Sequence, residues 1–148
     1  MKQVVTDNEL VKLTDFLSYS LNRSFVWGET HCSMLICRAW DYAKGSQNYK
    51  NYHEENFPVD SLEKAKELCA EKNGLVLLDY LGYEEIENGW RTGDVLYLFK
   101  DEIECMHIYT DGKLVSSFID GKVTAVNLYH VLKIIEQDEL EFKVFRKQ

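Results

Sequence analysis

The first half of the chain places apolar residues at helical spacing. Stripes with intervals of three and four residues run through residues 7–22, 31–44 and 60–72. Asp7 is a suitable N-cap for the first stripe and Thr30 for the second. We therefore predict three helices in this half, each with one apolar face turned toward the core.

The segments around these helices follow a weaker pattern. Residues 45–58 begin at a glycine, combine polar and aromatic residues without a clear period, and are predicted to form a long loop. Such a loop either lies over a functional pocket or is a solvated connection pinned by its tyrosines. The apolar run at 75–80 predicts a helical turn, and residues 83–87 predict a short edge strand with a solvated acidic face.

After Gly93 the apolar period changes from helical to two, which is typical of strands. Residues 94–99 are apolar on both faces, as in a central strand. Further strands are predicted at 102–110, 113–118, 122–127 and 140–145. The chain is therefore predicted to be α+β, with N-terminal helices packed on an antiparallel sheet of five or six strands.

Two dipeptides predict the strand register. Asp111-Gly112 and Asp120-Gly121 are preferred in two-residue hairpins. Counting outward from them pairs His107 with Ser116 and sets Ser116 opposite Ala125. The resulting sheet face is largely apolar, so we expect it to face the helices. Its members are Cys105, His107, Tyr109, Leu114, Ser116, Phe118, Val123 and Ala125.

Cys32 opens the apolar stripe of the second predicted helix. On spacing alone it is the first buried residue of a core helix, because free cysteines are often buried. Alternatively, the positive end of the helix favours a nucleophilic thiolate and stabilises an oxyanion. His107 is then the candidate base and Ser116 the group that orients its ring. A buried histidine hydrogen-bonded to Ser116 explains the same pattern without catalysis.

Composition and charge narrow the function classes. The 148 residues, 45% of them apolar, are expected to form one domain over 1–148. The formal net charge of −8 argues against nucleic acid or an anionic membrane as partner. The four cysteines show no C-x-x-C pair and the four histidines are scattered, so we expect no metal and no cofactor. Without an apparent export signal or membrane span, we expect synthesis in the cytoplasm and no membrane insertion.

Three short motifs carry a resemblance to a known family. The first is Phe25-x-Trp27-Gly28-x-x-x-Cys32 at the start of a helix, and the others are the segments 90–95 and 117–123. Together they resemble papain-like cysteine peptidases of the NlpC cell-wall type, above all small phage and prophage proteins with an F-x-W-G-x-x-D-C signature. The resemblance implies a single papain-like domain with Cys32 as nucleophile and cell-wall peptides as substrate.

The sequence also departs from that family. His31 stands where Asp commonly precedes the nucleophile, and Ser116 replaces a stronger orienting residue. When the family's H-x-G-I-Y run is aligned on Ile108 and Tyr109, Cys105 takes the histidine position, and His107 lies two residues further on.

Two functions follow from the resemblance and its departures. The first is a phage or prophage virion-associated protein of the tail or neck, which keeps the papain-like fold without turnover. It would be made in the bacterial host cytoplasm, enter the phage particle and bind other virion proteins. The alternative is an active cysteine hydrolase that cleaves peptidoglycan peptide amide bonds through Cys32 and His107. The lack of a cell-wall-binding repeat favours the particle-borne protein.

Overall fold

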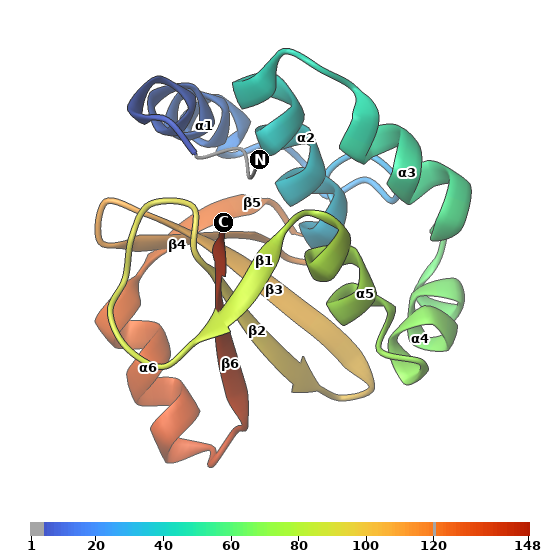
Figure 1. The fold of residues 1–148 in the computed structure, drawn as a ribbon. Helices are drawn as coiled ribbons and strands as arrows, with labels where there is room; N and C mark the ends of the chain where they lie inside the picture. Colours follow the sequence, from blue (N-terminus) through green and yellow to red (C-terminus); the bar gives the residue numbers. More distant parts are fainter. Residues whose placement is uncertain (1–4, 120) are drawn as a thin grey trace.

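The computed structural model describes residues 5–119 and 121–148, and within them the chain is α+β (Figure 1). Five helices precede the first strand, and a sixth lies before the last strand. The helices are α1 (Asp7–Ser20), α2 (Cys32–Lys44), α3 (Asn48–Asn56), α4 (Leu62–Ala70), α5 (Asn73–Tyr80) and α6 (Leu128–Gln137). The strands are β1 (Tyr83–Ile86), β2 (Val95–Lys100), β3 (Ile103–Thr110), β4 (Lys113–Ser117), β5 (Val123–Asn127) and β6 (Phe142–Lys147). None of the helices in the described ranges is long and apolar enough to span a bilayer.

The strands form one antiparallel sheet with the order β1-β6-β2-β3-β4-β5. One face packs against α1, α2 and α5 and contains Met106 and Ile108 of β3. The other face packs against α6 and contains Leu96 of β2 and Leu114 of β4. Figure 1 shows α6 on the opposite side of the sheet from α1 and α2. The sheet is therefore covered by helices on both faces.

Most of the predicted helices and strands are confirmed, with corrections at two helix starts. Thr6, rather than Asp7, caps α1 in a capping box with Glu9. Thr30 does not cap α2, because its Oγ1 accepts the Val26 N–H at 2.7 Å and donates to a carbonyl of the preceding loop. His31 occupies the N-cap position of α2 without a capping hydrogen bond from its side chain.

The prediction of a loop over residues 45–58 is wrong, because this segment contains α3. Its cap comes from α2: the buried Asp41 carboxylate accepts the backbone N–H groups of Tyr49 at 3.0 Å and Lys50 at 2.8 Å. A carboxylate at a helix N-terminus accepts hydrogen bonds from unpaired backbone N–H groups and interacts favourably with the positive end of the helix dipole. No local residue supplies this signal.

The helix α6 was not predicted, although its sequence carries a stripe. Leu128, Val131, Leu132 and Ile135 lie at helical spacing and pack on the sheet. Asn127 caps the helix by accepting the Tyr129 N–H at 2.9 Å. As a result, the sheet face opposite α1 and α2 is buried as well.

The two hairpins differ in how well their registers were predicted. Between β3 and β4, Tyr109 lies opposite Leu114, which agrees with the predicted turn at Asp111-Gly112. The ladder ends at Ile108 and Val115, so the predicted pair of His107 with Ser116 does not form. Between β4 and β5, Ser116 lies opposite Thr124 and not Ala125, so that prediction is off by one residue. The strands close with Ser117 opposite Val123, which makes the connection longer than a two-residue turn. Asp120, half of the predicted turn dipeptide, lies outside the described residues.

Asp94, in the second motif of the resemblance, has a structural role. Its buried carboxylate accepts two hydrogen bonds from the Arg146 guanidinium, at 2.9 and 3.0 Å, and one from the Arg91 N–H. The carboxylate raises the pKa of Arg146 by hydrogen bonding to it. The pair holds β6 against the start of β2, beside the central pairing of the sheet.

Candidate functional site

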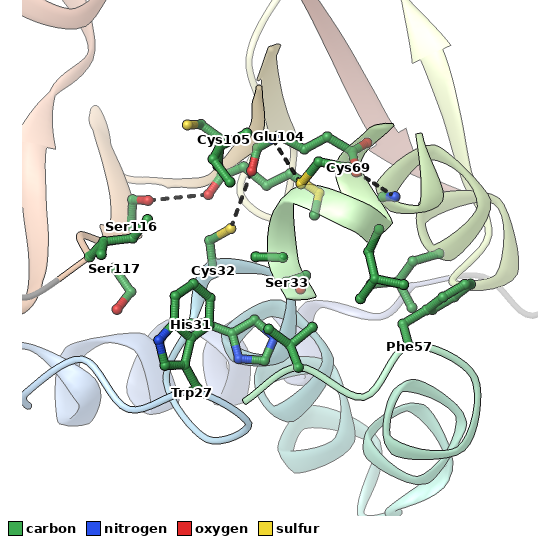
Figure 2. Close-up of a pocket in the computed structure, with 18 of the residues that line it drawn as sticks. Trp27, His31, Cys32, Ser33, Phe57, Cys69, Glu104, Cys105, Ser116 and Ser117 are labelled. Atoms are coloured by element: carbon green, nitrogen blue, oxygen red, sulfur yellow. Dashed lines mark hydrogen bonds between the residues drawn. The ribbon is translucent and has the colours of Figure 1, made fainter. Parts of the chain in front are cut away.

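A pocket of about 290 Å³ lies between the helices α2–α5 and the strands β3 and β4. Its walls include Cys32 and Ser33 of α2, Cys69 of α4 and Glu104 of β3. In Figure 2, Cys32 lies between Ser116 and Ser117 on one side and Cys69 on the other. All three predicted site residues, Cys32, His107 and Ser116, line this pocket.

The pocket exists because β3 and β4 separate. Their pairing covers only Ile108–Thr110 and Lys113–Val115. Beyond it, β3 stays paired with β2 and β4 stays paired with β5. Residues 103–107 therefore have no strand partner on the β4 side, and we call this stretch the free edge of β3.

Side chains take the place of the missing strand along the free edge. The Glu104 N–H donates to Cys69 Sγ at 3.2 Å, and the Cys32 thiol donates to the Glu104 carbonyl with an Sγ–O distance of 3.9 Å. The Ser116 hydroxyl donates to the Met106 carbonyl at 3.3 Å (Figure 2). The hydrogen-bond partners of Cys32 and Ser116 are thus backbone groups of β3.

The predicted orientation of the sheet face is wrong. Met106 and Ile108 pack in the cluster that includes α2, whereas Cys105 and Tyr109 pack in the cluster that includes α6. His107 alternates with the first pair and lies opposite Leu96 of the α6 side. His107 therefore shares a face with Cys105 and Tyr109 as predicted, but this face turns away from α2.

The described residues show no hydrogen bond between any two of Cys32, His107 and Ser116. The ring of His107 lies 6.4 Å from that of Phe118, centroid to centroid, and burial lowers its pKa to about 4. A catalytic dyad needs the thiol and the ring within hydrogen-bond reach. The catalytic roles of these three residues stay predictions.

The Cys32 thiol is protonated at neutral pH. Burial raises its pKa to about 12, the neighbouring Cys105 adds to the rise, and backbone N–H groups of Met106 and Ser33 only partly oppose it. Part of the side chain faces the pocket, yet protein atoms pack densely around the sulfur. The start of a helix alone does not produce a thiolate here.

Two histidines form a hydrogen-bonded cluster beside Cys32. The Gly28 N–H donates to His31 Nδ1 at 2.9 Å, which assigns the His31 proton to Nε2. That nitrogen lies 3.4 Å from His53 Nε2, and the Ser33 hydroxyl lies 2.8 Å from the same atom. His53 Nε2 is thus the shared acceptor of both donors.

This cluster is neutral and structural. Burial, with a smaller contribution from the charge of His53, lowers the pKa of His31 to about 3, and burial also lowers the pKa of His53. Both rings are buried, and together they join the loop before α2 to α3. No hydrogen bond between described residues connects either ring to Cys32. His53 lies in the segment 45–58 that was predicted to be a loop, so the sequence pattern did not indicate its partners.

Glu104 is a pocket residue that the sequence analysis missed. Its buried carboxylate accepts the Tyr97 hydroxyl at 2.5 Å and the Gly74 N–H at 3.0 Å, and so caps the start of α5. A Cβ on Gly74 would lie 2.6 Å from the carboxylate, so glycine is needed for this contact. The alternation of β3 could have identified Glu104 only if the buried face had been assigned correctly.

In the described part of the chain, no three His, Cys, Asp or Glu side chains are placed to hold a metal ion. Comparison with known proteins gave no match to a family model and none to a curated protein.

Proposed function

We propose that this chain is a papain-like domain of the NlpC type that serves as a virion-associated tail or neck protein and does not cleave peptides. The supporting observation is the environment of Cys32. The thiol begins α2 and points at the sheet, but it donates to the Glu104 carbonyl and has a raised pKa. A nucleophile needs the opposite arrangement, with a base accepting its proton.

The element order supports the fold part of the proposal. Helices come first, an antiparallel sheet follows, and a cysteine at the start of α2 packs against that sheet. The particle-borne role is drawn from the F-x-W-G-x-x-x-C resemblance to phage and prophage proteins.

Purified particles test the assembly role. Particles from an induced strain that carries this gene would be separated by density gradient, and their proteins quantified by mass spectrometry. We expect the chain to co-purify at a constant ratio to the tail proteins, with Cys32→Ser particles equal in yield and composition. Particles that lack the chain would contradict the proposal.

The second candidate is an active hydrolase, favoured by the presence of Cys32, His107 and Ser116 around one pocket. In that reaction, His107 takes the thiol proton, the sulfur attacks an amide carbonyl, and the amine leaves with the proton. Water then hydrolyses the thioester. Incubation with purified peptidoglycan peptides and mass spectrometry tests it, with Cys32→Ser as control. We expect no cleavage, whereas cleavage lost in Cys32→Ser would establish the hydrolase.

A further inference from the structure

Two buried polar atoms in the described residues lack a hydrogen-bond partner, Ser117 Oγ and His53 Nδ1. Both residues line the same pocket. Ser117 is only 7% exposed, and Figure 2 shows it beside Cys32 and Trp27. Buried polar groups are nearly always paired in folded proteins. The Ser117 hydroxyl in the wall of the pocket is therefore a group with which a bound ligand can pair.

The free edge of β3 supplies a second recognition element in the same pocket. Glu104 N–H is paired with a sulfur of Cys69, and the Glu104 carbonyl is paired with the thiol of Cys32 at 3.9 Å. Sulfur is a weak hydrogen-bond partner compared with an amide. A peptide strand that enters between β3 and β4 would offer amide groups to this edge, as in β-strand addition.

The charge of the pocket limits what enters it. Its described lining contains no Lys or Arg. Burial lowers the pKa of His31 to about 3 and of His107 to about 4, and raises that of Cys69 to about 11, so these groups are neutral at pH 7. The Glu104 carboxylate is already bonded to Tyr97 and Gly74. A ligand carboxylate or ammonium group would find no unpaired opposite charge in this lining.

We propose that the pocket binds a short, uncharged, extended segment of a partner protein, which adds to the free edge of β3 and hydrogen-bonds to the Ser117 hydroxyl. The volume of about 290 Å³ is at the small end for ligand pockets, so only a few residues enter it. Apolar walls such as Phe25, Trp27 and Phe57 favour apolar side chains on that segment. This inference rests on the proposed function, since it assigns the pocket to binding.

A library of acetylated and amidated hexapeptides tests the binding. The immobilised protein would be exposed to the library, and the retained peptides sequenced by mass spectrometry. We expect the two central positions to be enriched in apolar residues and depleted of Asp, Glu, Lys and Arg. With the strongest peptide, the amide NMR signals of Glu104 and Met106 should shift. Retention of charged peptides, no retention, or shifts confined to another surface would each overturn the proposal.

Two neighbouring serines give a matched pair of variants. Ser117→Ala removes an unpaired hydroxyl, so it should raise the Tm of the free protein, by roughly 2–4 °C, and weaken peptide binding roughly fivefold or more. Ser116→Ala removes the hydrogen bond to Met106 and should lower the Tm. If Ser117→Ala also lowers the Tm and leaves binding unchanged, the hydroxyl has a structural partner and the proposal fails.

The outcomes also separate this inference from the proposed function. Retained peptides that stay intact support both. Cleavage of a retained peptide, lost in Cys32→Ser, would contradict the function without turnover and leave the binding site standing. Absence of peptide binding, with the chain present in particles, would overturn only the binding site.

Discussion

At the scale of single residues, the position of Cys32 was predictable and its chemistry was not. The apolar stripe of α2 correctly predicted that Cys32 faces the sheet. Its hydrogen-bond partner depends on the separation of β3 from β4, which no local pattern encodes. The raised pKa follows from dense packing around the sulfur, a property of the assembled core. A prediction based only on the position of a cysteine at the start of a helix therefore sets the pKa of a densely packed thiol too low.

His107 gives a testable pH dependence at the same scale. Its pKa is lowered from 6.5 to about 4 by burial, so the folded state holds a neutral ring where the unfolded state binds a proton. The stability is complete above pH 6.5 and falls as the pH drops toward 4, at up to about 1.4 kcal/mol per pH unit. We expect His107→Leu to show a shallower fall than the wild type, measured by urea unfolding between pH 7 and 4.5.

The exposed His130 supplies the control for this measurement. His130→Gln should keep the wild-type slope. Equal slopes for His107→Leu and the wild type would mean that His107 takes up its proton without unfolding, contrary to the lowered pKa of this half-buried ring.

At the scale of elements, a cap that lies next to its helix can be read from the sequence, whereas a cap from a distant element cannot. Ser61 caps α4 and Gly45 ends α2, and both are readable in the sequence. By contrast, α3 is capped by Asp41 and α5 by Glu104, each from another element. The apolar spacing of α3 was nonetheless present, because Tyr49, His53 and Phe57 lie four residues apart.

Removing the distant cap should loosen α3. In Asp41→Ala, the N–H groups of Tyr49 and Lys50 lose their acceptor, and we expect a loss of about 1–3 kcal/mol in the free energy of unfolding. Hydrogen exchange should show that the variant speeds exchange, relative to the wild type, more at these two amides than at other amides of the chain. Glu54→Ala, which removes an exposed ion pair with Lys50 at 3.6 Å, is the control and should cost under about 0.5 kcal/mol. Equal effects of the two variants would refute the capping role.

At the scale of the whole molecule, the sequence predicted the α+β class and an antiparallel sheet, but not which sheet face meets α2. Both faces of β3 are apolar enough to be buried, since α6 covers the second one. Alternation along a strand shows which residues share a face and does not show which layer covers it. Because of this ambiguity, the prediction placed His107 opposite Cys32. In the structure His107 shares the face of β3 that packs against α6, although it still lines the pocket.

The same layering explains why the pocket lies where it does. β3 is paired with β2 along Ile103–Ile108. Its pairing with β4 stops at Ile108, and the pocket between the two separated strands is lined by residues of the helices α3–α5. Cys32, Cys69 and Ser116 then hydrogen-bond to the backbone of Glu104 and Met106 on the free edge. The hydrogen bond to the Glu104 carbonyl and the raised pKa thus make Cys32 a protonated partner of β3.

The pH dependence of Cys32 alkylation tests that claim most directly. Native protein would be labelled with iodoacetamide between pH 6 and 10, and each cysteine followed by mass spectrometry, in the wild type and in His107→Gln. With a pKa of about 12, the Cys32 rate should be low below pH 8, still rise at pH 10 without a plateau, and be unchanged by His107→Gln. A plateau below pH 8 that disappears in His107→Gln would show a thiolate paired with that histidine and would contradict the account.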